Sequence, residues 1–145
     1  MAPTKNYKYE ERLIWDGESG GRVEVGKSME LRLDMPVEFG GRGRYPCPDE
    51  LFLAGSAGCL LTTFLYFRKK LNLQMKHFEV LTSGKLSSGP DGYRIARIEY
   101  RMNIKTNSSE RTKARRCVEL TKRYCHLTRI LEKIIPIKIT AGIEC

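Results

Sequence analysis

A stretch of 17 residues without a charged side chain, from Leu51 to Phe67, places the strongest constraint on how this chain folds. A Pro-Asp-Glu triplet precedes the stretch and an Arg-Lys-Lys triplet follows it, which matches the charges that a helix macrodipole favours at its two ends. Apolar residues occupy every side of the predicted helix, so it is either buried or lies in a bilayer. Its glycine and threonine content and its length favour burial and predict no membrane partner.

The remaining segments predict an α+β fold, because strands outnumber helices and do not alternate with them. A second helix is predicted after Asn107, with Asn107 as the cap and Glu110 three positions on. Residues at helical spacing form its inner stripe: Ala114, Cys117, Val118, Thr121 and Cys125. Strands are predicted at residues 7–15, 22–25, 29–33, 77–86, 93–105 and 135–143, and a short helical segment at 127–134.

These elements predict one domain over residues 1–145, with an antiparallel-rich sheet of five or six strands packed on the long central helix and on the second helix. The segment SSGPDG between two of the strands predicts a hairpin turn. One sheet covers only one side of an apolar helix, so a second copy of the chain is expected to cover the other side.

The charge and the amino terminus limit the partners and the compartment. The formal net charge is +9, but acidic residues are interleaved with the basic ones and no nucleic-acid recognition motif accompanies them, so no nucleic-acid partner is predicted. The first residues lack the apolar core of a signal peptide, which predicts a cytoplasmic protein.

Five cysteines without a CxxC pair argue against a secreted disulfide framework and against a zinc ribbon. Cys59 lies in the middle of the apolar stretch, where a cysteine most often serves only in packing. A functional role requires a thiolate and a second thiol within reach. Cys125 is the best candidate for that second thiol, because it ends the inner stripe of the second helix; Cys117 and Cys47 remain possible alternatives, and Cys145 is treated as incidental.

Two segments resemble motifs of the OsmC and organic hydroperoxide resistance superfamily. PDELFLAGSAGC resembles the helix motif that carries the reactive cysteine, and RYCHLTRIL resembles the second motif, a cysteine followed by two residues and a hydroxyl residue. The order and the interval of the two motifs also match. The resemblance implies an intertwined homodimer with two active sites at the subunit interface.

The resemblance also implies a thiol-dependent peroxidase that reduces organic hydroperoxides, and hydrogen peroxide as a further possible substrate. Cys59 would be the thiolate that attacks the peroxide, and Cys125 the thiol that resolves the sulfenic acid to a disulfide. A dithiol, with lipoyl groups as the usual donor in the organic-hydroperoxide branch, would reduce that disulfide. No metal, haem or other cofactor is implied.

The family uses an arginine held by a carboxylate, which stabilises the thiolate and polarises the peroxide. Asp49 and Glu50 are both candidates for the carboxylate, and helical geometry favours Asp49. Arg22 and Arg42 rank equally as the arginine, with Arg44 third.

The sequence departs from the family pattern at two positions. His126 stands where a proline usually follows the second cysteine, and it could be a proton donor, although an exposed histidine at a helix start is the simpler interpretation. Cys47 lies just before the first motif and has no counterpart in the pattern. The alternative function is a non-catalytic dimer of the same fold, acting as a ligand-binding or structural protein, in which both cysteines only pack.

Overall fold

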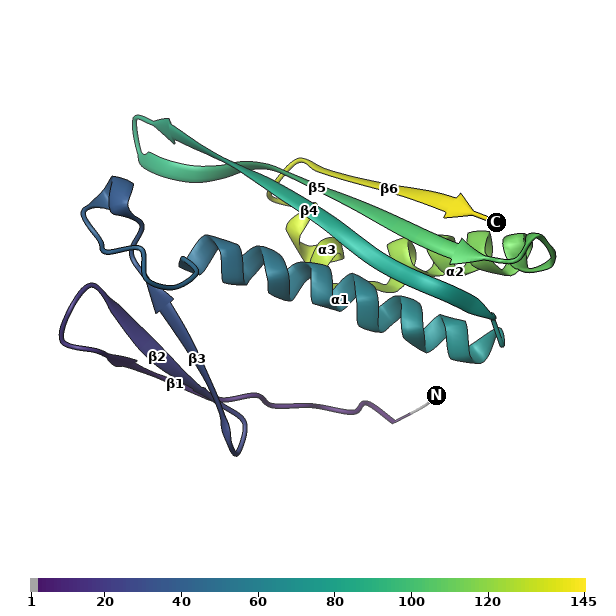
Figure 1. Ribbon diagram of the computed structural model, residues 1–145, viewed down its shortest axis with the longest axis horizontal. Helices are drawn as coiled ribbons and strands as arrows, with labels where there is room; N and C mark the ends of the chain where they lie inside the picture. Colours follow the sequence, from purple (N-terminus) through teal and green to yellow (C-terminus); the bar gives the residue numbers. More distant parts are fainter. Residues whose placement is uncertain (1–2) are drawn as a thin grey trace. The chain divides into compact units, whose positions relative to one another are not determined.

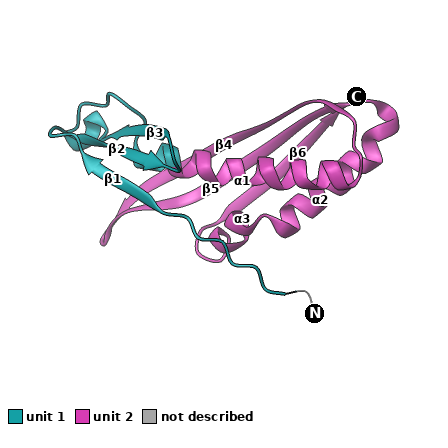
Figure 2. Cartoon of the chain, turned by 90° about the horizontal axis from the view of Figure 1, so that it is seen from below, with its two compact units in different colours: residues 1–51 teal, residues 52–145 magenta. Residues whose placement is uncertain are grey.

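The computed structural model describes residues 3–145 and divides them into two compact units. The first unit ends at Leu51 and the second is Phe52–Cys145 (Figure 2). The prediction of a single domain stays a prediction.

The first unit contains a three-stranded antiparallel sheet in the order β1-β2-β3. Its strands are β1 (Glu11–Trp15), β2 (Gly20–Val25) and β3 (Met29–Asp34), and a short 3-10 helix, η1 (Val37–Phe39), follows them. The three strands confirm the predicted meander, although the first is shorter than predicted. The long helix α1 (Pro48–Lys70) begins at the end of this unit and continues through the next.

The second unit contains a second three-stranded sheet, with helices on one of its faces (Figure 1). Its elements after α1 are β4 (Met75–Gly89), β5 (Gly92–Thr106), η2 (Ser108–Glu110), α2 (Arg111–Tyr124), α3 (His126–Leu131) and β6 (Ile137–Glu144). Strands β4 and β5 form the predicted hairpin, in which Gly92 has a φ of 98°, a backbone conformation that favours glycine.

The pairing of the strands corrects one expectation and adds one feature that the sequence did not predict. The strands form two sheets of three rather than one sheet of five or six. Strand β6 pairs parallel to β5, since the chain crosses back over the sheet through α2 and α3 before β6 begins. Both features depend on contacts between distant segments, which local residue patterns do not encode.

The core of the second unit lies between its sheet and its helices. Alternate residues of β5 point into it, and all are at most 1% exposed: Ile98, Tyr100, Met102 and Ile104. Helix α2 contributes the predicted inner stripe, and α1 contributes Ser56, Cys59, Leu60 and Phe64. Strand β4 approaches α1 closely at Gly84, where a Cβ atom would lie 2.9 Å from Cδ1 of Leu53.

The predicted cap of the second helix is wrong. Asn107 precedes the 3-10 helix η2 and makes no hydrogen bond from its side chain to the helix start. The carboxylate of Glu110 instead accepts a hydrogen bond from the backbone N–H of Gln74 at 2.9 Å, and this bond lowers the pKa of Glu110, with Lys113 adding to the effect. Glu110 therefore pairs with the backbone of a distant residue rather than taking part in a local cap with Asn107.

Helix α1 is buried on one face only in the single chain. Its inner face packs on the sheet, whereas four of its large apolar residues are exposed: Phe52, Leu61, Leu65 and Tyr66. Within residues 3–145 it is the one helix long and apolar enough to cross a membrane by length and composition. Its packing on the sheet is that of a core helix.

Candidate active site

Two cysteines far apart in sequence meet in the core of the second unit. Sγ of Cys125 lies 3.2 Å from Sγ of Cys59, although the residues are 66 positions apart. Cys59 is 7% exposed and Cys125 is fully buried. The structure therefore brings together the two thiols that the sequence analysis selected.

Helix geometry on each side places these thiols. Cys59 lies on the inner face of α1, one turn after Ser56. Cys125 lies at the junction of α2 and α3, where its backbone is extended at φ −65° and ψ 107°. Its N–H still bonds to the carbonyl of Thr121, and its own carbonyl accepts the N–H of Arg129. The chain thus leaves one helix and enters the next at Cys125, which holds this thiol firmly.

The environment of Cys59 disfavours its thiolate. Burial raises the pKa of the Cys59 thiol, and the neighbouring Cys125 adds to the rise. The backbone N–H of Leu127 and the hydroxyl of Thr63 act in the opposite direction, because each donates to a thiolate. The net direction is upward, so Cys59 is a protonated thiol at neutral pH in this environment.

His126 contacts the same sulfur from the start of α3. Its Nδ1 lies 3.6 Å and its Nε2 lies 4.0 Å from Sγ of Cys59. The residue as a whole is exposed. An exposed residue of α3 therefore contacts the buried thiol of α1.

A buried tyrosine lies in the same cluster as the thiols. The hydroxyl of Tyr100 donates to Oγ of Ser56 at 2.7 Å, and Ser56 in turn donates to the carbonyl of Leu53 at 2.8 Å. Burial raises the pKa of Tyr100, and the charges that Cys125 and Cys59 can carry raise it further. This relay supports α1 on the sheet one turn before the reactive position.

Replacing Ser56 by alanine is expected to destabilise the protein by about 1–3 kcal/mol, because the buried Tyr100 hydroxyl would lose its acceptor. Adding Tyr100→Phe to Ser56→Ala removes the unpaired donor. Tyr100→Phe is therefore expected to cost less stability in the Ser56→Ala background than in the wild type. Urea denaturation of both single variants and the double variant measures this coupling. Additive free energies of unfolding would contradict it.

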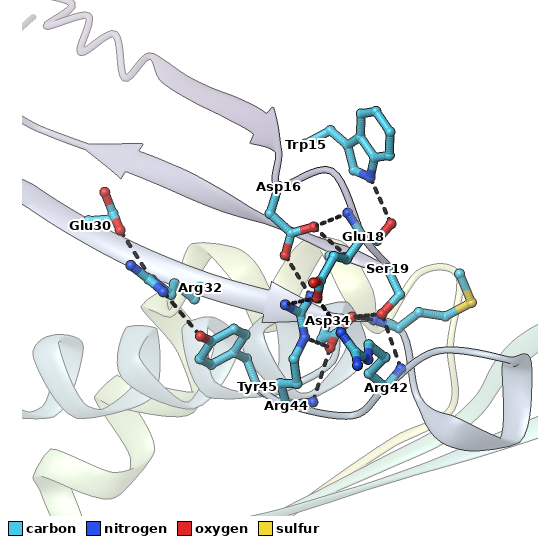
Figure 3. A network of polar contacts seen from close by, with 12 residues as sticks. Trp15, Asp16, Glu18, Ser19, Glu30, Arg32, Asp34, Arg42, Arg44 and Tyr45 are labelled. Carbon is cyan, nitrogen blue, oxygen red and sulfur yellow. Dashed lines mark hydrogen bonds and ion pairs between the residues drawn. The ribbon is translucent and has the colours of Figure 1, made fainter.

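Two of the three arginine candidates, Arg42 and Arg44, lie in a network of carboxylates in the first unit (Figure 3). All three guanidinium nitrogens of Arg44 are engaged: Nε with Asp34 at 2.7 Å, Nη1 with Glu18 at 2.6 Å and Nη2 with Asp16 at 2.6 Å. Arg44 and Ser19 hold the pKa of the buried Asp34 well below its usual range, and the carboxylates hold that of Arg44 above its own. Arg44 thus joins the β1–β2 turn to the end of β3.

The other predicted residues of this group have fewer partners. Arg42 donates to Glu18 at 2.7 Å, and Arg22 is exposed on β2. Glu50 accepts the backbone N–H of Cys47 at 2.8 Å, which is a capping contact at the start of α1. Asp49 is exposed in the first turn of that helix. The carboxylates that contact Arg42 and Arg44 are therefore Asp16, Glu18 and Asp34 rather than the two predicted from sequence.

A comparison with protein families places the sequence of this chain. The family model described as OsmC-like protein matches residues 41–140, which include both cysteines. The chain belongs to the OsmC-like protein family. No curated protein matches it in sequence.

Solved structures of OsmC-like proteins share the fold over nearly the whole chain. An OsmC-like protein from Mycoplasma pneumoniae matches with a TM-score of 0.83 at 18% identity, covering 97% of this chain and 100% of that one. An organic hydroperoxide resistance protein from Elizabethkingia anophelis has a TM-score of 0.78 at 19% identity, over 98% and 100% of the two chains. A protein from Legionella pneumophila described as an organic hydroperoxide resistance protein OsmC has 0.75 at 20%, over 96% and 99%. These matches show the fold.

The remaining cysteines of this OsmC-like protein lie apart from the thiol pair. Cys117 is fully buried in the other core cluster, with Phe64 and Met102, and burial raises its pKa to about 11. Cys47 is half-buried in the first unit and Cys145 is exposed.

Sequence analysis missed the pairing of Tyr100 with Ser56. One signal was available, since Tyr100 falls at an inward position of an alternating strand, where a buried hydroxyl needs a partner. The identity of that partner depends on how α1 packs on β5, which is not encoded locally.

Proposed function

We propose that this OsmC-like protein is a cysteine-based peroxidase that reduces organic hydroperoxides. The contact of 3.2 Å between Sγ of Cys59 and Sγ of Cys125 carries the proposal, since it allows a disulfide to form with little movement of the helices. The names of the Elizabethkingia and Legionella proteins, which describe organic hydroperoxide resistance, support the substrate class.

The first step oxidises Cys59. Its sulfur, as thiolate, attacks the terminal oxygen of the hydroperoxide, so that an S–O bond forms while the O–O bond breaks. The alkoxide leaves and takes up one proton to become the alcohol. Sulfur loses two electrons and the peroxide gains them, which leaves a sulfenic acid on Cys59.

The second step uses Cys125. Its sulfur attacks the sulfenic sulfur of Cys59, an S–S bond forms, and the S–O bond breaks with release of water. A dithiol then reduces the disulfide with two electrons and two protons. We propose a small or protein-bound dithiol, such as a lipoyl group, as this donor.

The surroundings of the thiol pair favour a hydroperoxide with a hydrocarbon part. Apolar and aromatic side chains of α1 and α2 line an open groove of about 570 Å³ that begins at Thr62 and Thr63, one turn after Cys59. Tyr66, Phe67, Leu120 and Tyr124 form the rest of its lining. Such a surface offers more contact to an alkyl or aryl group than to hydrogen peroxide.

The proposed site also includes an arginine and its carboxylate. Arg44 is the weakest candidate, because its guanidinium already meets three carboxylates. Arg22 and Arg42 therefore remain the proposed arginines that would orient the peroxide. Asp49 and Glu50 remain the proposed carboxylates.

The exposed apolar face of α1 supports a homodimer. Leu61 and Leu65 are one turn apart on this face, and the exposed Tyr124, Leu127 and Ile130 extend the apolar surface onto α2 and α3. A second copy of the chain would cover these residues, as in the predicted two-layered arrangement.

Steady-state turnover tests the proposal. The protein is mixed with cumene hydroperoxide and dithiothreitol, and the alcohol formed and the dithiol oxidised are both measured. We expect one alcohol per dithiol, at a rate proportional to protein concentration. Hydroperoxide loss that equals the protein-free control would favour the non-catalytic binding protein instead.

The raised pKa of Cys59 gives a pH prediction. A raised pKa means that the thiolate is scarce at neutral pH and becomes abundant only as pH rises through that value. Alkylation of Cys59 by iodoacetamide, followed by peptide mass spectrometry, is therefore expected to have its midpoint above the ordinary thiol value of about 8.5. A midpoint below that of an exposed thiol such as Cys145 would contradict the prediction and indicate a cation beside the sulfur.

A further inference from the structure

The geometry points to His126 as the catalytic residue that takes the proton of the Cys59 thiol and delivers it to the departing alkoxide. This inference rests on the proposed peroxidase function. It is carried by the distances of 3.6 Å and 4.0 Å from Nδ1 and Nε2 of His126 to Sγ of Cys59.

The two distances describe where the sulfur lies. Since they differ by only 0.4 Å, the sulfur is nearly equidistant from both ring nitrogens rather than in line with one N–H bond. A rotation about the side-chain bonds of His126 would align either nitrogen, and contacts of this kind often tighten only when substrate is bound.

A base is needed at this sulfur because its environment keeps it protonated. Burial raises the pKa of Cys59, and the backbone N–H of Leu127, although it stabilises a thiolate, can accept no proton. The hydroxyl of Tyr100 donates its hydrogen bond to Oγ of Ser56 and not to the sulfur. Among the described residues that contact Sγ of Cys59, His126 carries the side chain that most often serves as a general acid and base.

The neighbouring elements present few other charges to this pair. The thiol of Cys125 comes from the α2–α3 junction and the phenol of Tyr100 from β5. The charged residues closest in sequence to His126 are all basic: Lys122, Arg123 and Arg129.

The protons then balance within one cycle. Neutral His126 accepts the proton of the Cys59 thiol as the sulfur attacks the terminal peroxide oxygen. The imidazolium that results gives this proton to the alkoxide as the O–O bond breaks. Thiol and hydroperoxide have then become sulfenic acid and alcohol, and His126 is neutral again.

The test compares single-turnover oxidation of Cys59 in four proteins: wild type, His126→Ala, His126→Asn and the matched control His77→Gln. The chain has only two histidines, and His77 is exposed on β4 beside Glu79. Each reduced protein is mixed with cumene hydroperoxide at pH values from about 5.5 to about 10, a range that extends to both sides of neutrality. Oxidation is followed by quenching and mass spectrometry of the Cys59 peptide.

The rate of the wild type and of His77→Gln is expected to rise with pH through an inflection that lies below the ionisation of the thiol and reports the base. His126→Ala should lose that inflection and be slower at pH 7 by about a hundredfold, the lower end of what general acid–base catalysis contributes. The difference should shrink above the pKa of the thiol, where the thiolate forms without a base. His126→Asn keeps a hydrogen-bond donor near the position of Nδ1 but exchanges no proton, so it should behave like His126→Ala.

Three results would overturn the inference. The first is an inflection that persists in His126→Ala, and the second is full recovery in His126→Asn, which would indicate positioning by a hydrogen bond. The third is a constant ratio of rates across the pH range. Failure of the peroxidase proposal itself is distinguishable, because Cys59 of the wild type would then not be oxidised at any pH. Alkylation of Cys59 by iodoacetamide would still reveal whether the reactivity of this thiol depends on His126.

Discussion

Replacing Cys59 by serine is expected to lower the rate of hydroperoxide reduction by at least about a thousandfold, to the level of the protein-free reaction. A serine hydroxyl is not oxidised by a hydroperoxide, so no sulfenic acid forms and the cycle cannot start. Alcohol production from cumene hydroperoxide with dithiothreitol measures the effect.

Cys117→Ala is the matched control for this variant. Cys117 is also a fully buried helical cysteine, but it lies in the other core cluster. We expect it to retain the wild-type rate while losing some stability, because a buried sulfur is removed. Equal loss of activity in both variants would indicate general disruption of the core rather than chemistry at Cys59.

Replacing Cys125 by serine is expected to separate the two chemical steps. Cys59 should still be oxidised, but the sulfenic acid should persist, since no thiol lies 3.2 Å away to condense with it. Dimedone should then label Cys59 almost completely in Cys125→Ser and hardly at all in the wild type. Excess peroxide without reductant should convert the variant irreversibly to the sulfinic acid and so inactivate it.

The control for this second variant is Cys47→Ser, which removes the one half-buried cysteine within residues 3–145 and leaves the thiol pair intact. We expect it to form the disulfide as the wild type does. Dimedone labelling of Cys59 in Cys47→Ser, with none in Cys125→Ser, would assign the resolving role to Cys47.

Local patterns in the sequence predicted most of the secondary structure. The uncharged stretch predicted α1, the alternation from Ile98 to Ile104 predicted the buried face of β5, and SSGPDG predicted the hairpin. The cap at Asn107 and the single sheet were wrong. The contacts that form instead join segments distant in sequence. Glu110 accepts the backbone N–H of Gln74, and β6 pairs with β5.

In the candidate site, too, local features could be predicted from the sequence and contacts between distant segments could not. Each cysteine lies in a recognisable local motif, so the pair could be selected from sequence and from the family resemblance. The contact of His126 with the sulfur and the support of Ser56 by Tyr100 arise only when α1, α3 and β5 pack together. The carboxylates around Arg44 come from two separate segments of the first unit, the β1–β2 turn and the end of β3, which no motif joins.

Peptide mapping after mild oxidation tests the central claim most directly. The fully reduced protein is treated with one equivalent of cumene hydroperoxide, its remaining thiols are blocked at acid pH, and the digested peptides are analysed without reduction. The account predicts one dominant cross-linked species that joins the Cys59 and Cys125 peptides, with Cys117 blocked as a free thiol. A mixture dominated by disulfides of Cys47 or Cys117, or a Cys59 that stays reduced while peroxide is consumed, would contradict it.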